Sequence, residues 1–189
     1  MNICTISLMP TAYSNPWQTL RSREIYENPW IRVREDQVIN PSGGRGIYGV
    51  VSFKNKALGI IPVDAHGNTY LVGQYRYALE AYSWEIPMGG GALDLPVLES
   101  AKRELREETG LSAARWTQIL HLHTSNSVTD EEGFVFLAQD LTEGDTDFEE
   151  TEDLRIWQLP LEEAIAMTRR AEITDAISVA GLLAVSAFL

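Results

Sequence analysis

Hydrophobic and polar positions alternate in short runs through the first half of the chain, a pattern typical of half-buried β-strands. Segments rich in Asn, Pro, Gly and Asp interrupt these runs at 40–44 and 64–68 and predict turns. The predicted strands are 30–39, 46–53, 58–63, 69–77 and 83–86. We expect the first two of these to form an antiparallel hairpin, and the segment 1–20 to be a mobile arm or an extended start.

The second half of the chain mixes strand and helix patterns. Its predicted strands are 114–123, 134–139 and 155–159, and the predicted loops between them are 124–133 and 143–152. Helices follow at 160–170 and 174–188, with Thr174 as the N-cap, and the apolar run 176–189 is too short to span a bilayer. Strands interrupted by one helix, with helices at the end, predict an α/β (α+β) fold with a mixed sheet packed between helices.

The stretch 89–111, GGGALDLPVLESAKRELREETGL, predicts the central helix. Asp94 can cap its N-terminus, Pro96 is tolerated in the first turn, and Gly110 stands where a left-handed C-cap residue is expected. One face of this helix is an apolar stripe that can be buried, formed by Leu98, Ala101 and Leu105.

The neighbouring face of the helix is acidic. Glu104, Glu107 and Glu108 are spaced i, i+3 and i+4, so their carboxylates lie together and repel one another. Arg103, one turn before Glu107, can orient that carboxylate. A solvated acidic helix would explain a single Glu-Glu pair, but three co-facial glutamates after a glycine-rich entry indicate a site for Mg²⁺ or Mn²⁺.

This stretch resembles the signature of the Nudix hydrolase family. The signature is Gly, five residues, Glu, seven residues, then Arg-Glu-apolar-any-Glu-Glu-any-Gly-apolar. Leu95 stands where the signature has its first Glu. The matching residues are Gly89, Arg103, Glu104, Leu105, Glu107, Glu108, Gly110 and Leu111.

The resemblance implies a Nudix α/β/α sandwich over 45–189, preceded by an arm and hairpin at 1–44 that we expect to contribute to a homodimer. It also implies two or three Mg²⁺ or Mn²⁺ ions in each active site. Their expected ligands are the backbone carbonyl of Met88 and the carboxylates of Glu104, Glu107 and Glu108, of which Glu107 and Glu108 also count as catalytic.

Two further segments resemble the subgroup that splits ADP-ribose and other nucleoside diphosphate sugars. These are Gln74-Tyr75-Arg76-Tyr77 and the run 84–90, WEIPMGG. The resemblance implies that Arg76, with Gln74 nearby, binds the diphosphate, and a guanidinium can do so in a bidentate manner. A Glu on the loop 124–133 is the expected general base, and spacing favours Glu131 with Glu132 as the alternative.

The net charge of −12 argues against nucleic-acid or anionic-membrane partners. A single cysteine, Cys4, allows no internal disulfide and fits the cytoplasm. His121 and His123 can share a strand face, but no third ligand is evident, which favours ordinary strand residues over a zinc site. Trp17, Trp30 and Tyr48 are expected to pack in a core or dimer contact, and the resemblance implies stacking on the substrate base as the alternative.

Together these features predict metal-dependent hydrolysis of the pyrophosphate bond of a nucleoside diphosphate sugar, giving a nucleoside monophosphate and a sugar phosphate. ADP-ribose, GDP-mannose and UDP-glucose types all remain open as substrates. One alternative is a housecleaning hydrolase of nucleoside triphosphates or dinucleoside polyphosphates. The other is a non-catalytic nucleotide-binding regulator, for which Leu95 is the supporting feature.

Overall fold

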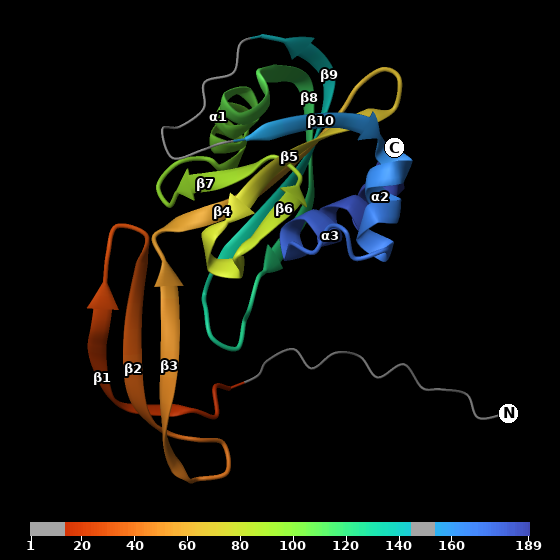
Figure 1. Ribbon diagram of the computed structural model, residues 1–189. Helices are drawn as coiled ribbons and strands as arrows, with labels where there is room; N and C mark the ends of the chain where they lie inside the picture. The colour runs from red at the N-terminus through yellow and green to blue at the C-terminus, as the bar shows by residue number, and fades with distance from the viewer. Residues whose placement is uncertain (1–13, 145–153) are drawn as a thin grey trace, which may run out of the picture.

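A computed structural model describes residues 14–144 and 154–189 of the chain. The start of the predicted arm, 1–13, and most of the predicted acidic loop at 143–152 lie outside the described residues. The described chain forms a small N-terminal sheet that projects from a larger body made of a second sheet and helices (Figure 1).

The N-terminal sheet has three antiparallel strands in the order β1-β2-β3. The turn between β2 and β3 is closed by Asn40, whose side-chain oxygen accepts hydrogen bonds from the Ser42 and Gly44 N–H groups at 3.0 and 2.9 Å. The predicted hairpin is present, but β1 was not predicted as a strand. Its sequence, QTLRSREIYE, shows no regular alternation of hydrophobic and polar residues, which is the signal that predicts a half-buried strand. In the structure this strand is exposed along its whole length. The strands are β1 (Gln18–Glu27), β2 (Ile31–Ile39) and β3 (Arg45–Phe53).

The larger sheet is mixed and has seven strands. Five lie in the order β10-β5-β4-β9-β8, while β6 pairs with β5 and β7 pairs with β4. The β4–β9 pair is parallel, and the other pairs are antiparallel. The strands are β4 (Asn55–Val63), β5 (Asn68–Arg76), β6 (Ala81–Glu85), β7 (Met88–Ala92), β8 (Leu111–His123), β9 (Glu132–Glu143) and β10 (Arg155–Pro160).

Helices cover both faces of this sheet and confirm the predicted α/β/α sandwich. The α1 helix lies on one side, and α2 and α3 lie on the other (Figure 1). Among the described helices, none is long and apolar enough to cross a membrane. The helices are α1 (Val97–Thr109), α2 (Leu161–Arg169) and α3 (Ala176–Ala184), with short 3₁₀ turns η1 (Tyr77–Leu79) and η2 (Val185–Ala187).

The core has two layers, one on each side of the sheet. Central strand β4 serves both layers, because successive side chains of a strand point to opposite faces. Leu58 and Ile60 pack in the layer under α1, together with Ala101 and Leu105 of that helix. Ile61 packs in the other layer, under α2 and α3. The apolar stripe predicted on the central helix is therefore buried as expected.

The helix ends both confirm and correct the sequence predictions. Gly110 ends α1 with a φ of 72°, the left-handed conformation that favours glycine. The N-cap position of α1 is Pro96 and has no side-chain hydrogen bond, so Asp94 does not cap the helix. At α3 the cap is Asp175, whose carboxylate accepts from the Ser178 N–H at 2.7 Å, and the prediction of Thr174 was wrong by one residue.

The glycines before α1 form strand β7, which was not among the predicted strands. Gly89, Gly90 and Gly91 pair with Leu58, Ala57 and Lys56 of β4, respectively. Glycine has a weak intrinsic preference for strands, so tertiary pairing rather than local propensity fixes this segment.

The cap correction gives a first prediction. Replacing Asp175 by Ala removes the hydrogen-bond acceptor for the first turn of α3 and should lower the free energy of unfolding by about 0.5–2 kcal/mol. Thr174→Ala is the matched control and should cost less, and Asp175→Asn should retain most of the stability. Urea denaturation followed by circular dichroism measures all three, and a Thr174→Ala loss equal to that of Asp175→Ala would contradict the assignment.

Candidate active site

The acidic face of α1 is turned inward. Glu104 and Glu108 are only 8% and 2% exposed, and Glu107 is half-buried. Arg103 bridges two of these carboxylates, because Nη1 donates to Glu107 Oε2 at 2.6 Å and Nη2 contacts Glu104 Oε1. Arg103 Nη2 also donates to the Gly90 carbonyl at 3.1 Å, which ties the helix to β7. The predicted pairing of Arg103 with Glu107 is confirmed.

Charge compensation explains how this face tolerates burial. Partial burial alone would lower the pKa of the Arg103 guanidinium, but the negative charges of Glu104 and Glu107 and their hydrogen bonds raise it above its ordinary value. Arg103 therefore stays charged and offsets part of the repulsion between the carboxylates. Glu108 is held differently, by the Met88 N–H, which donates to its Oε2 at 2.9 Å.

Gly89 lies where β7 passes close to the helix. A Cβ atom at this position would lie 2.0 Å from Glu104 Cδ and 2.1 Å from its Oε2. Real Cβ atoms do not approach other atoms this closely, so a side chain here would have to displace the Glu104 carboxylate, which Arg103 contacts. The first glycine of the predicted motif thus has a direct packing reason.

A pocket of about 710 Å³ opens beside Met88. The β5–η1 junction, the loop between β8 and β9, and the start of α3 form its walls. Of the predicted site residues, Arg76, Met88 and Glu131 line it, whereas Gln74 is half-buried on β5 and is not among the described lining residues. The lining is completed by Ala57, Tyr77, Ala78, Leu79, Glu85, Thr124, Thr174, Asp175, Ala176 and Ile177.

Arg76 is held in this pocket by a buried carboxylate. Its Nε donates to Glu85 Oε1 at 3.0 Å, and its Nη2 contacts Glu85 Oε2. The hydrogen bonds with Glu85 raise the pKa of Arg76, against the opposing effect of burial, and the charges of Asp175 and Glu108 raise it further. Because 37% of the Arg76 side chain is still exposed, the guanidinium is fixed in direction yet accessible from the pocket. The structure thus identifies Arg76 as the partner of Glu85.

Glu131 and Glu132 have different surroundings. Glu131 lines the pocket, where its Oε2 accepts a hydrogen bond from Thr124 Oγ1 at 2.6 Å. Glu132 is the first residue of β9 and contacts His121 Nε2 through Oε1 at 3.0 Å. Of the two candidate bases, only Glu131 is among the described residues that line the pocket with Arg76.

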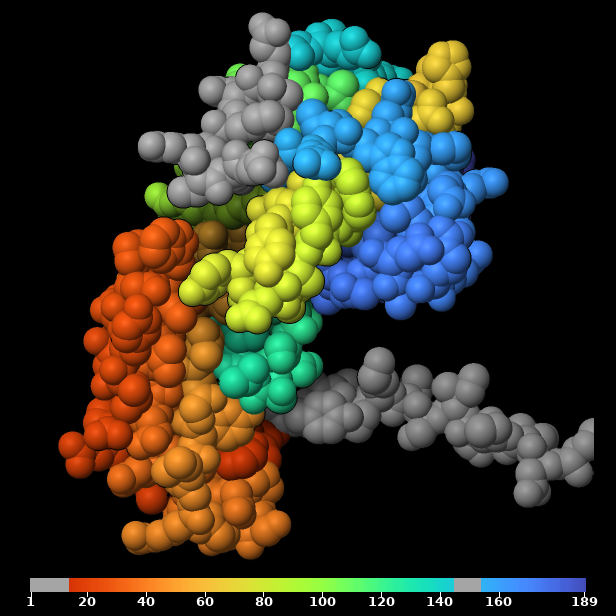
Figure 2. All heavy atoms as spheres, viewed as in Figure 1, coloured from red at the N-terminus to blue at the C-terminus, as the bar shows by residue number. Residues whose placement is uncertain are grey.

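The loop that carries Glu131 is fastened to the N-terminal sheet. Tyr48 Oη donates to the Ser127 carbonyl at 2.6 Å, and Ser52 Oγ donates to Asp130 Oδ2 at 2.7 Å. The Val51 N–H adds a backbone bond at 2.9 Å to the carbonyl of Val128. Figure 2 shows this loop, in teal, against the orange strands. Sequence reasoning missed these contacts because the partners lie far apart along the chain; Ser127, for example, is 79 positions after Tyr48.

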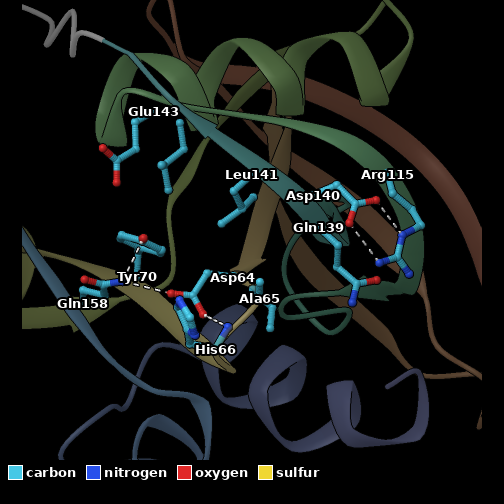
Figure 3. Close-up of a pocket in the computed structure, with 12 residues that line it drawn as sticks. Asp64, Ala65, His66, Tyr70, Arg115, Gln139, Asp140, Leu141, Glu143 and Gln158 are labelled. Carbon is cyan, nitrogen blue, oxygen red and sulfur yellow. Dashed lines mark hydrogen bonds and ion pairs between the residues drawn. The ribbon is translucent and has the colours of Figure 1, made fainter.

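A second cavity, of about 480 Å³, lies elsewhere on the large sheet and contains none of the predicted site residues. Gln158 Nε2 donates to Asp64 Oδ2 at 3.0 Å and to the Tyr70 hydroxyl at 2.9 Å, while Arg115 and Asp140 pair with each other at one side of the cavity (Figure 3). These polar groups hydrogen-bond to one another in the wall, so this cavity is a weaker candidate for the active site.

Comparison with known proteins agrees with this geometry. The NUDIX domain model matches residues 54–178, and the model described as the nucleoside diphosphate sugar hydrolase N-terminal domain matches residues 17–51. The match to the N-terminal domain covers most of the three-stranded sheet. The NUDIX match covers the acidic helix and the pocket walls and ends in the first turn of α3.

Individual relatives extend over most of the chain. The ADP-ribose pyrophosphatase of Mycobacterium tuberculosis (strain ATCC 25618 / H37Rv) is 36% identical over 177 residues, which cover 90% of this chain and 84% of that protein. The ADP-ribose pyrophosphatase of Bacillus subtilis (strain 168) is 30% identical over 161 residues, covering 84% and 86%. A crystal structure of an ADP compounds hydrolase has the same fold, with a TM-score of 0.83, 22% identity, and coverage of 95% of this chain and 97% of that one.

The close approach at Gly89 gives a second prediction. Gly89→Ala must displace the Glu104 carboxylate or the β7 backbone, and overpacking of this kind should lower the free energy of unfolding by about 1–3 kcal/mol. Gly46→Ala is the matched control, because a Cβ at that exposed strand position meets no atom within 4 Å. Thermal unfolding of both variants measures the difference, and equal melting temperatures would show that the contact is not constraining.

Proposed function

We propose that this chain, which belongs to the Nudix hydrolase family and hydrolyses pyrophosphate bonds, acts on ADP-ribose and related nucleoside diphosphate sugars with the help of divalent metal ions. The products would be a nucleoside monophosphate and a sugar phosphate. One observation carries the proposal: a single pocket brings together the cation Arg76, the carboxylate Glu131 and Met88, whose N–H holds Glu108 of the acidic helix.

The residues of α1 fit hard divalent cations. Mg²⁺ and Mn²⁺ prefer oxygen ligands, and the buried Glu104 and Glu108 with the half-buried Glu107 provide them, together with the Met88 carbonyl. Arg103 contacts Oε1 of Glu104, and because a carboxylate has about four lone-pair sites, this ion pair and a metal ion can share the same side chain. We expect two or three ions, which when bound would neutralise the diphosphate and lower the pKa of a coordinated water.

The side chains of the pocket then have separate roles. Arg76 binds the diphosphate through its guanidinium, a charge-assisted and directional contact. Glu85 keeps that guanidinium oriented by its hydrogen bonds to Nε and Nη2, which reduces the entropy lost on binding. Glu131 accepts the proton of the attacking water, and its hydrogen bond from Thr124 holds the carboxylate in the pocket wall.

The substrate class rests on the relatives and on the N-terminal sheet. The two proteins from M. tuberculosis and B. subtilis are named for ADP-ribose, and the N-terminal family model is named for nucleoside diphosphate sugars. ADP-ribose is therefore the first substrate to test, with GDP-mannose and UDP-glucose next. Gln74, on the strand that ends at Arg76, belongs to the proposed substrate-binding segment through this resemblance.

The proposal includes a homodimer in the cytoplasm. The N-terminal sheet exposes large apolar side chains, and clusters of this kind mark contacts between proteins. A single cysteine is consistent with a reducing compartment. No nucleic-acid or membrane partner is proposed, because the net charge is −12. The exposed apolar side chains, with their exposed fractions, are Leu20 50%, Ile25 49%, Tyr26 54%, Trp30 67% and Ile47 69%.

A substrate panel tests the function. Purified protein with Mg²⁺ should convert ADP-ribose to AMP and ribose 5-phosphate, and an excess of chelator should abolish the turnover. Glu108→Gln should lose most of the activity, because it removes the negative charge of a proposed metal ligand, while its amide oxygen can still accept the Met88 N–H bond. Faster turnover of nucleoside triphosphates or dinucleoside polyphosphates would favour the housecleaning alternative. Nucleotide binding without turnover would favour a regulator.

The loop carboxylates give a separate prediction. Glu131→Gln should lower kcat by about 10²- to 10⁴-fold with little change in KM, because a general base acts mainly in the transition state. Glu132→Gln should have a smaller effect, since Glu132 contacts His121 and is not among the lining residues. Steady-state kinetics on ADP-ribose distinguishes them, and a reversed order of the two losses would assign the base to Glu132.

A further inference from the structure

Two histidines and a glutamate gather on the surface at the end of the β8–β9 pair. The ligand atoms of His121, His123 and Glu132 all lie within 4.8 Å of one another. No third ligand for the two histidines is evident in the sequence, and the structure brings a candidate beside them, because Glu132 stands directly opposite His123 in the strand register. Strand pairing supplied a neighbour that spacing along the chain could not reveal.

The strands explain why these side chains share a face. His121 and His123 are two positions apart on β8, so both point to the same side of the sheet. Their ring centroids are 5.6 Å apart. Glu132 and Phe134 are the corresponding pair on β9, opposite His123 and His121 respectively. The three polar side chains therefore occupy three corners of one small patch, with Phe134 at the fourth.

Part of this patch is already held in place. The His121 ring stacks on Phe134, with centroids 4.6 Å apart and an interplanar angle of 6°. Its Nε2 lies 3.0 Å from Glu132 Oε1. Lys56 Nζ is the nearby cation, 5.5 Å from the centroid of the Phe134 ring. With side chains of His121 and Glu132 exposed by 45% and 40%, an ion can reach them directly from solvent.

We propose that His121, His123 and Glu132 form a binding site for a transition-metal ion of the Zn²⁺ type. Imidazole suits Zn²⁺, Ni²⁺ and Cu²⁺, whereas Mg²⁺ takes oxygen ligands, so this site and the acidic helix select different ions. Two imidazoles and one carboxylate leave a coordination position for water, as in other three-ligand sites.

The distances agree with such an ion. Zinc bonds of about 2.0–2.1 Å in a tetrahedral arrangement place ligand atoms about 3.3 Å apart. The His121–Glu132 contact of 3.0 Å is already close to this value. The remaining separations, up to 4.8 Å, can close by rotation of exposed side chains about their single bonds, without backbone movement.

The site also has a mechanical consequence. His123 directly precedes Thr124, and Glu132 directly follows Glu131, so an ion bound to both would join the two ends of the loop 124–131. Thr124 and Glu131 are already hydrogen-bonded to each other on that loop. Metal binding would therefore restrain the segment that carries Glu131. An effect on turnover rests on the proposed function, but binding of the ion does not.

Titration with ZnCl₂ tests the site directly. Isothermal calorimetry is run on the full chain in excess Mg²⁺, which keeps the oxygen-ligand site occupied by its own ion. The wild-type protein should bind one Zn²⁺ that is lost, or weakened by at least about 10-fold, in His123→Ala and in Glu132→Gln. His66→Ala is the matched control, because His66 lies in the turn between β4 and β5 and should leave the affinity unchanged.

A spectroscopic measurement completes the test. Co²⁺ substituted for Zn²⁺ should give visible absorption bands of a nitrogen-ligated ion in the wild-type protein and in His66→Ala, but not in the His121→Ala/His123→Ala variant. Equal Zn²⁺ affinity and identical Co²⁺ spectra in all variants would overturn the proposal. Because neither readout uses substrate, loss of the zinc site and failure of the proposed hydrolysis can be told apart.

Discussion

The burial of like charges between α1 and β7 is the constraint on which the rest of the site depends. Glu104 and Glu108 are almost fully enclosed, and their repulsion is offset by Arg103 and by the Met88 N–H. Gly89 leaves room for the Glu104 carboxylate, which a side chain at that position would have to displace. The glycine-rich strand β7 has a low intrinsic preference for strand structure, yet it packs against the helix. Met88, its first residue, lies at the edge of the pocket.

The N-terminal sheet is a second structural support. Three hydrogen bonds from β3 reach the loop between β8 and β9, through Tyr48, Val51 and Ser52. That loop carries Glu131, so a region outside the NUDIX match helps to position a residue inside it. The regions matched by the two family models are thus joined by hydrogen bonds, from the small sheet to this loop of the NUDIX match.

The loop before β9 and the first residue of β9 have different surroundings. Glu131, the last residue of that loop, lines the pocket with Arg76 and Thr124, while Glu132, the first residue of β9, lies beside two imidazoles on the surface. Two adjacent carboxylates are thus placed beside different chemical groups, a guanidinium and a hydroxyl in one case and two histidines in the other.

The sequence by itself determined the sandwich, the acidic helix, the apolar stripe beneath it and the pairing of Arg103 with Glu107, because each depends on local spacing within a helix or strand. Tertiary structure alone decided the exposed strand β1, the glycine strand β7, the partnership of Arg76 with Glu85, and the meeting of His123 with Glu132. All of these join residues from different strands or fix a segment with no hydrophobic pattern. Local periodicity reports which face of an element is buried, but which neighbour it meets is set by strand order and register, and these arise only when the whole sheet assembles.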